Sequence, residues 1–381
     1  MKRTGRSARG AGYLCLSFAA AALWSFTAPA RAGEPPYRLT WLGGNFYPYA
    51  INEQGHVVGY DTRQRGYGPA LLYDGTRVRE LGEGEAQDIS NNGRIVLGVP
   101  VTGIGTPGPV LLEPDGTRRP LGLQYGWGGD FRHQFSINDS GQVVGQEALR
   151  ANTSDGRAFL WDNGTITYLD LGFPVAHSSA HGINNAGQVV GWYDATQSGG
   201  GYVWENGRTT LLPTAAVDIN ERGQVLTLDG VWENGKMTIA PTLPLLPVSD
   251  ENMSPTAFVR EINDAGQVAG YSLELFLINP EDGHGNIERA FVWDPATGTL
   301  RDLNAIMGFE PDTFNQFPLT LASDINNAGQ VIGFGTNGGW LLTPVPEPAG
   351  GVLALLLTAW FLGRRRAGGF RKTVPLSSAR P

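Results

Sequence analysis

The chain has 381 residues, a formal net charge of −8, 54 glycines and only 17% charged residues. Five of its 28 basic residues lie in residues 1–32 and six in residues 349–381, so residues 33–348 hold 17 basic against 36 acidic groups, a net charge of −19. Such an acidic body repels phosphate backbones and anionic membranes, and we therefore expect no nucleic-acid partner.

Residues 1–32 have the layout of a cleavable secretory signal. Four basic residues precede an apolar stretch over residues 13–27, and small-x-small sites end at Ala30 and Ala32. We expect signal peptidase to cleave at one of these alanines and the protein to be exported. Because Cys15 is the only cysteine, the mature chain then has no disulfide and no thiol chemistry.

One motif, of the form Ile-Asn-x-x-Gly-Gln-Val-Val-Gly, recurs seven times along the body. The copies are 38, 48, 46, 36, 43 and 63 residues apart, and such periods are typical of propellers or helical arrays. The abundance of glycine and the strand-like pattern exclude helical repeats. The copies begin at Ile51, Ile89, Ile137, Ile183, Ile219, Ile262 and Ile325.

Each part of the motif has a physical reason. The isoleucine ends a buried strand, and the asparagine starts a turn because its side chain can bond to the backbone two residues on. The first glycine takes a positive φ. The valines that follow are apolar on both faces, as in a sheet covered on both sides. The second glycine allows close backbone approach; it is Gly59, Gly145, Gly191, Gly270 and Gly333.

Each unit holds four short strands, so we predict an all-β, seven-bladed β-propeller over residues 37–344. The last unit stops at residues 338–344 without its fourth strand, whereas the body begins with one unpaired strand at residues 37–43. We therefore expect the N-terminal strand to close the ring and to leave no lone edge. The signal peptide and a C-terminal hydrophobic helix would flank this propeller.

The repeat, followed by Arg-Ala-Phe-[Leu/Val]-Trp at Arg157 and Arg289, resembles the HAF extracellular repeat family. Arginine stands here where the family's name triplet has histidine. The resemblance covers nearly the whole body and implies an exported repeat protein. It implies no catalytic residues.

The C-terminal end combines Val-Pro-Glu-Pro at residues 345–348, an apolar run at 352–362 and three arginines. This order resembles the PEP-CTERM sorting signal of Gram-negative bacteria. The resemblance implies processing by an exosortase, transient anchoring in the inner membrane through a helix within residues 345–366, and a basic cytoplasmic tail at 367–381. The destination would be the cell surface or the extracellular matrix. The sorting motif comprises Pro346, Glu347, Pro348, Arg364, Arg365 and Arg366.

The body contains no motif for a catalytic site, a metal site or a cofactor. His177 and His181 are four residues apart, but on a strand that spacing does not bring two ligands together. The aspartates of the "WDNG"-type hairpins, namely Asp74, Asp115, Asp162 and Asp294, are explained by turn chemistry.

Four tryptophans share one repeat position, where other units have Tyr73 and Glu113. We interpret them as core between blades rather than as a row of sugar-binding residues. They are Trp161, Trp204, Trp232 and Trp293.

The strongest breaks in the repeat are residues 123–133 and 272–288, which we expect to form long loops. Because function concentrates on loops of a rigid scaffold, a candidate ligand patch joins Tyr125, Trp127, Phe131 and Phe276. The sequence thus favours a non-enzymatic surface or matrix protein that contacts exopolysaccharide or another protein. The alternative is a carbohydrate-active propeller enzyme, a glycosidase or lyase, with carboxylates at one mouth of the ring.

Overall fold

The computed structural model describes residues 36–63, 68–99, 108–123, 135–148, 156–195, 198–246, 255–279, 283–310 and 316–346. Residues 33–345 form one compact unit. The signal peptide with Ala30 and Ala32, and the sorting motif after Pro346, lie outside the described residues. Within the described ranges, no helix has the length and apolar character needed to cross a membrane.

The unit consists of seven four-stranded antiparallel sheets, which we call blades 1 to 7. Blade 1 comprises β2 (Phe46–Ile51), β3 (Val57–Asp61), β4 (Ala70–Tyr73) and β5 (Val78–Gly82). Blade 2 comprises β6 (Glu85–Ile89), β7 (Ile95–Gly98), β8 (Val110–Leu112) and β9 (Arg118–Pro120). Blade 3 comprises β10 (Phe135–Ile137), β11 (Val143–Ala148), β12 (Gly156–Asp162) and β13 (Thr165–Tyr168).

The remaining blades follow the same order. Blade 4 comprises β14 (His177–Ile183), β15 (Val189–Ala195), β16 (Ser198–Glu205) and β17 (Arg208–Leu212). Blade 5 comprises β18 (Ala216–Ile219), β19 (Val225–Thr227), β20 (Gly230–Glu233) and β21 (Lys236–Ile239). Blade 6 comprises β22 (Thr256–Ile262), β23 (Val268–Asn279), β24 (Gly283–Asp294) and β25 (Thr299–Asp302). Blade 7 comprises β26 (Leu321–Ile325), β27 (Val331–Gly335), β28 (Gly338–Pro344) and β1 (Tyr37–Gly43).

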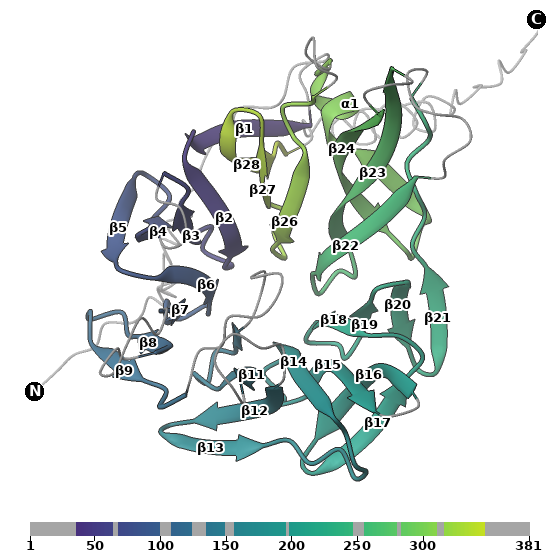
Figure 1. The fold of residues 1–381 in the computed structure, drawn as a ribbon. Coiled ribbons are helices and arrows are strands. Elements are labelled where there is room, and N and C mark those ends of the chain that lie inside the picture. The colour runs from purple at the N-terminus through teal and green to yellow at the C-terminus, as the bar shows by residue number, and fades with distance from the viewer. Residues whose placement is uncertain are drawn as a thin grey trace, which may run out of the picture. The chain divides into compact units, whose positions relative to one another are not determined.

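The blades surround a common middle, and the first strand of the chain completes the last blade (Figure 1). β1 runs antiparallel to β28, with Tyr37 opposite Pro344 and Trp41 opposite Trp340. The predicted seven-bladed propeller and its closure by residues 37–43 are therefore confirmed.

The repeated strands are buried on both faces, as the double valine predicts. Val57 belongs to the apolar cluster between blades 7 and 1, whereas Val58 belongs to the cluster between blades 1 and 2. Each of the seven junctions between blades has such a cluster among the described residues. Burial of each large aliphatic side chain contributes about 1.5–3 kcal/mol, so apolar packing between blades supplies the core.

The turn glycines have the two roles that the sequence predicts. Gly187 has φ +79°, and its N–H donates to the carbonyl oxygen of Asn184 at 3.0 Å. At Gly191 an added Cβ would lie 1.9 Å from the carbonyl oxygen of Ser179 on the neighbouring strand. The first glycine supplies a left-handed turn and the second permits close approach of two strands.

The insertion at residues 272–288 is not a loop, contrary to our expectation. β23 and β24 extend through it as paired twelve-residue strands, and Phe276 lies opposite Gly285. The segment is rich in Leu, Phe and Ile, whose strand propensity favours continued pairing. The other part of the candidate patch, Tyr125, Trp127 and Phe131, lies outside the described residues.

One short helix, α1 (Leu303–Met307), follows β25. Asp302 caps its start by accepting the N–H groups of Asn304 and Ala305, and Gly308 ends it with φ +70°. The sequence predicts only a strand ending here.

Candidate functional site

The asparagines of the repeat link the blades to one another. The Nδ2 group of Asn184 donates to the carbonyl oxygen of Asn220 in the next blade at 3.1 Å, and Asn220 repeats this contact to Asn263 at 2.9 Å. The same contact occurs at six of the seven junctions. It is absent after blade 2, because Ser90 has no amide. The donors are Asn52, Asn138, Asn184, Asn220, Asn263 and Asn326.

A second set of hydrogen bonds closes completely around the ring. The backbone N–H of the residue after each asparagine, or after Ser90 in blade 2, donates to the side chain of its counterpart in the next blade, at 2.7 to 3.0 Å. The successive residues are Glu53, Asn91, Asp139, Asn185, Glu221, Asp264 and Asn327. The repeat motif is therefore scaffold. Sequence reasoning missed this ring, although every copy has Asn, Asp or Glu at that position.

An acidic residue directly precedes the isoleucine in four of the seven blades, namely Asp88, Asp218, Glu261 and Asp324. In six innermost strands a β-bulge lies just before the residue that precedes the isoleucine. A bulge changes the direction in which nearby side chains point. Asp324 accepts the N–H of Ile51 in the next blade at 2.8 Å, and Asp88 accepts that of Ile137 at 2.8 Å. The unpaired edge of an innermost strand faces the ring axis. We infer that these carboxylates lie beside the axis.

Burial raises the pKa of these acids. The pKa of Asp88 is raised to about 6 and that of Asp324 to about 8, in both cases mainly by desolvation, with nearby carboxylates adding to the shift. Desolvation also raises the pKa of Glu261 well above its usual range, and the charge and hydrogen bond of Asp218 act in the same direction. Charging these neighbouring acids at the same time is therefore unfavourable.

Aromatic side chains gather at the opposite end of the innermost strands. Tyr47 stacks on Phe334 with ring centroids 4.9 Å apart, and Tyr49 stacks on Tyr60 at 5.3 Å. Tyr47 also lies 5.4 Å from both Tyr49 and Tyr60. We call these four residues the aromatic cluster. Three of them are half-buried, so their rings are accessible at the surface.

Two buried polar side chains lie on the adjacent strand β6. A hydrogen bond joins Tyr49 to Glu85, but burial outweighs it and raises the pKa of Glu85 to about 7. Within the described part of the chain, Glu85 Oε2 and both amide atoms of the fully buried Gln87 have no hydrogen-bond partner. The unmatched Oε2 of Glu85 next to Tyr49 makes this end of the ring a candidate ligand site, since burial of a polar atom without a partner is unfavourable.

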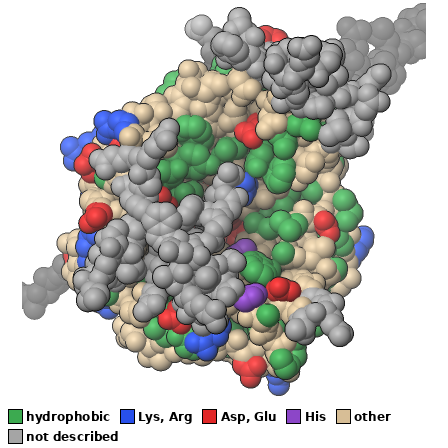
Figure 2. Space-filling view, in the orientation of Figure 1, with side chains coloured by type: hydrophobic (Ala, Val, Ile, Leu, Met, Phe, Trp, Pro, Cys, Tyr) green, Lys and Arg blue, Asp and Glu red, His purple; other side chains and the backbone are tan. Residues whose placement is uncertain are grey.

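Blade 6 presents a smaller aromatic pair at the same strand position. Phe258 stacks on Tyr271 at 4.9 Å, and the Arg260 guanidinium lies 5.3 Å from the Tyr271 centroid. Figure 2 shows hydrophobic side chains gathered around the middle of the ring, with histidine and basic side chains among them. Such a rim combines apolar surface with a few polar groups, as ligand sites do.

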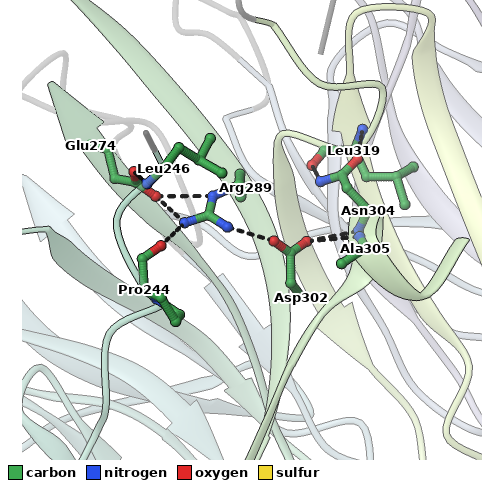
Figure 3. A network of polar contacts seen from close by, with 8 residues as sticks. All are labelled: Pro244, Leu246, Glu274, Arg289, Asp302, Asn304, Ala305 and Leu319. Atoms are coloured by element: carbon green, nitrogen blue, oxygen red, sulfur yellow. Dashed lines mark hydrogen bonds and ion pairs between the residues drawn. The ribbon is translucent and has the colours of Figure 1, made fainter. Parts of the chain in front are cut away.

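The arginine of the second Arg-Ala-Phe triplet has a structural role. Arg289 forms ion pairs with Glu274 and with Asp302, the latter at 2.7 Å, and donates to the carbonyl oxygen of Pro244 (Figure 3). Glu274 in turn accepts the N–H of Leu246 at 3.0 Å. This buried network fixes the extended hairpin of blade 6 to the segment before β22.

The first triplet differs, because Arg157 is exposed. Its guanidinium lies 4.1 Å from the Tyr168 ring centroid and 3.9 Å from Glu147. The arginine at this repeat position therefore has no single function.

The histidine pair does not form a site. His177 and His181 both lie on β14, and burial lowers the pKa of His181 to about 4. No group of three or more His, Cys, Asp or Glu among the described residues is arranged to hold a metal ion.

The hairpin aspartates mostly act as predicted. Asp74 and Asp294 accept N–H groups of their own turns, as does Asp115. Asp162 instead accepts a hydrogen bond from Gln142 at 3.0 Å, because Asn163 and Gly164 adopt positive φ and form that turn themselves.

The tryptophans are part of the core between blades, as we expected. Trp161 and Trp293 are 4% and 2% exposed, and Trp204 and Trp232 pack against the neighbouring clusters. The strand register corrects one assignment. In blade 2 the tryptophan position is occupied by Leu112 and not by Glu113. Leu112 lies opposite Ile95, as Trp204 lies opposite Val189 in blade 4.

Comparison with known proteins supplies only distant similarities. No family model matches the chain, and no curated protein matches it. Among solved structures, "YCF48 bound to D1 peptide" is similar with a TM-score of 0.43 and 10% identity, covering 84% of this chain and 97% of that one. TolB from Acinetobacter baumannii has a TM-score of 0.34 and 11% identity, with 81% and 66% covered. The gluconolactonase XC5397 from Xanthomonas campestris has a TM-score of 0.38 and 12% identity, with 83% and 92% covered.

Proposed function

We propose that the protein is an exported, non-enzymatic propeller of the cell surface or extracellular matrix that binds a neutral glycan at the aromatic cluster. The observation that carries this proposal is the group of four aromatic rings, which include two stacked pairs, with Tyr49 hydrogen-bonded to Glu85, whose Oε2 has no partner among the described residues. Aromatic faces pack against the apolar faces of sugar rings, and amide and carboxyl groups bind the hydroxyls. The acidic body disfavours anionic sugars.

The inner carboxylates have a structural use that supports a non-enzymatic role. Asp88, Asp218 and Asp324 each accept the isoleucine N–H of the following blade. These N–H groups lie on strand edges that have no other strand beside them, and each needs a partner when buried. The carboxylates therefore supply the hydrogen-bond acceptors that a neighbouring strand would otherwise provide.

Glycan binding can be tested on purified residues 33–345 with an array of neutral and uronic-acid oligosaccharides, followed by calorimetry. We expect binding to neutral glycans, and at least a tenfold loss in Tyr47→Ala and Tyr60→Ala with little change in melting temperature, because both rings are half-exposed. Tyr168→Ala, which removes an exposed tyrosine from the outermost strand of blade 3, is the matched control. Equal binding by all three variants would contradict the assignment of the site.

The destination is supported by the signal-like residues 1–32 and by the resemblance of residues 345–366 to a PEP-CTERM signal. The HAF-like repeat agrees with export. We expect alanines at Pro346, Glu347 and Pro348 to leave the C-terminal tail uncleaved in a host that has an exosortase. Normal processing of that variant on immunoblots would reject this destination.

One observation favours a carbohydrate-active enzyme as the second candidate. Glu261 and Asp218 share a hydrogen bond, and Glu261 has a strongly raised pKa. Glycosidases likewise combine one protonated and one charged carboxyl group, but hold them about 5 Å or more apart with the sugar between them, so these two side chains would have to separate when a sugar binds. This candidate predicts hydrolysis of the glycan that binds, and loss of that hydrolysis in Glu261→Gln. Binding without turnover would exclude it.

A further inference from the structure

Blade 6 repeats the geometry of the aromatic cluster with one change of chemistry. Three repeat positions come together in blades 1 and 6: the residue four before the isoleucine, the residue opposite it in the second strand, and the bulge residue two before the isoleucine. In that order they are Tyr47, Tyr60 and Tyr49 in blade 1, and Phe258, Tyr271 and Arg260 in blade 6. Arginine therefore stands where blade 1 has the tyrosine that bonds to Glu85.

The two rings of blade 6 form a flat platform at the surface. Phe258 stacks on Tyr271 with ring centroids 4.9 Å apart and ring planes 13° from parallel. Phe258 is 36% exposed and Tyr271 only 7%, so the accessible surface of the pair belongs mainly to Phe258. An accessible aromatic face of this kind packs against the apolar face of a sugar ring.

Arg260 is a cation without an acidic partner. It is half-buried, its guanidinium lies 5.3 Å from the Tyr271 centroid, and its Nη2 donates to the Tyr271 hydroxyl oxygen at 3.4 Å. No carboxylate among the described residues pairs with it, and the adjacent Glu261 shares a hydrogen bond with Asp218 instead. Partial burial of a charge is unfavourable without a counter-charge, so an anionic group of a ligand would stabilise this arginine.

A second arginine–tyrosine contact shows the arrangement when the protein supplies that counter-charge. The Arg157 guanidinium lies 4.1 Å from the Tyr168 centroid, and Glu147 lies 3.9 Å from it and accepts the Tyr168 hydroxyl. Arginine, ring and carboxylate are all present there. In blade 6 the arginine and the ring are present and the carboxylate is missing.

We infer that Phe258, Tyr271 and Arg260 bind a sugar unit that carries a carboxylate, that is, a uronic acid. The sugar ring packs on Phe258, and its carboxylate accepts the N–H groups of the guanidinium. This inference rests on the proposed glycan-binding function and adds an acidic unit to the ligand. The acidic body repels a chain of many uronic acids, whereas a single carboxylate is matched by Arg260.

The test compares methyl glucuronide with methyl glucoside, which differ only in a carboxylate against a hydroxymethyl group. Each is titrated into purified residues 33–345 and followed by saturation-transfer NMR. We expect the glucuronide to bind at least about threefold more tightly, since the gain is one ion pair. Added salt should reduce this preference, because it screens the pair.

Arg260→Gln should remove the preference with little change in melting temperature, and Phe258→Ala should weaken binding of the glucuronide. Arg157→Gln is the matched control, because its guanidinium also lies on a tyrosine but already has a carboxylate beside it. Tyr47→Ala separates the two proposals. It should remove glucoside binding at the aromatic cluster and leave glucuronide binding at Arg260 in place.

Several outcomes would overturn the inference. One is equal affinity of the wild-type protein for the two sugars, and another is an unchanged preference in a folded Arg260→Gln. If Arg260→Gln does not fold, unchanged glucuronide binding in Phe258→Ala has the same effect. Tighter binding of phenylacetate than of the glucuronide would assign Arg260 to an aromatic carboxylate or an acidic peptide instead of a sugar.

Discussion

At the scale of single residues, the asparagine of the repeat does more than start a turn. Asn184 is 2% exposed; its Oδ1 accepts the N–H of Gln188 at 3.0 Å while its Nδ2 reaches Gln188 Oε1 and the next blade. One side chain thus satisfies groups within its own turn and across a junction. Loss of any buried partner leaves a polar group unmatched, which costs about 1–3 kcal/mol.

We therefore expect Asn184→Ala to lower the free energy of unfolding by about 2–3 kcal/mol. Chemical denaturation monitored by tryptophan fluorescence measures the loss. Asn185→Ala, next to it but exposed, should cost less than about 1 kcal/mol, because the hydrogen bonds that its side chain forms with Asp139 are solvated. A larger loss at Asn185 than at Asn184 would contradict the role of the buried amide.

The two glycines of blade 4 offer a matched pair with different physics. Gly191→Ala places a methyl group against the carbonyl oxygen of Ser179, so the strands must separate. Gly187→Ala meets no atom within 4 Å and has only a positive φ to accommodate. We expect a loss of about 1 kcal/mol at Gly187 and a clearly larger loss at Gly191. Equal melting temperatures for the two variants would count against this explanation.

At the scale of elements, β1 joins the two ends of the ring. It pairs with β28 along six residue pairs, and Tyr37 is buried in the cluster between blades 6 and 7. Without β1, β28 becomes an exposed edge and this cluster opens to water. The effect of one strand should therefore extend to both neighbouring junctions.

We predict that removing residues 36–43 from the 33–345 protein lowers the melting temperature of the whole propeller in a single transition. The reason is that each blade is packed between two others, so the loss is not confined to one end. A peptide with the sequence of residues 36–43, added in excess, should restore part of the stability by mass action. A variant that melts like the parent protein, or loses only blade 7 in a separate transition, would disprove this.

The elements that sequence could predict are those specified locally. The turns at Asn184 and Gly187 and the closing strand at residues 37–43 follow from residue type and from counting strands. The bulges before Asp88 and Asp324, and the contacts between them and the next blade, depend on neighbours about 40 or more residues away or at the other end of the chain. Sequence reasoning also misplaced Glu113, because a hairpin register that is wrong by one residue changes the face of every side chain.

The candidate site was less predictable than the fold. The proposed patch was placed on residues that break the repeat, but Phe276 proved to lie within a long strand. The aromatic cluster consists partly of residues inside the repeats, such as Tyr60 directly after Gly59 and Phe334 after Gly333. The signal was present as an aromatic residue after the second glycine. Its meaning depends on ring closure, which brings Tyr47 of blade 1 beside Phe334 of blade 7.

At the scale of the whole molecule, the inner acids couple stability to pH. Folding raises the pKa of Glu85 to about 7, of Asp88 to about 6 and of Asp324 to about 8. Unfolded carboxyls titrate near 4, so between pH 4 and pH 8 the folded state binds more protons than the unfolded state. The contribution of these groups to stability is therefore greatest below about pH 4. It is lost as the pH rises from there to the folded pKa of each group, by about 1.4 kcal/mol per pH unit for each group between its two pKa values.

We expect the melting temperature to fall steadily from pH 5 to pH 8. Asp324→Asn should flatten this dependence, because the amide still accepts the Ile51 N–H but does not ionise. Asp74→Asn is the control, since that exposed carboxyl has its pKa lowered to about 2 by its Thr76 and Arg77 contacts and is fully charged throughout. A pH profile of Asp324→Asn identical to that of wild type would show that this acid is not responsible.

Ring closure by the first strand also determines the order of events during biosynthesis. Among the strands of the propeller β1 leaves the ribosome first, yet its partner β28 ends at Pro344 and is made last. Roughly 300 residues must therefore emerge while the first strand has a free edge, and closing so large a loop is slow. Until β28 is made, the growing chain consists of blades in an open ring. The unpaired edges of its strands can then pair with the wrong partner. We therefore expect the propeller to close only after β28 has been made.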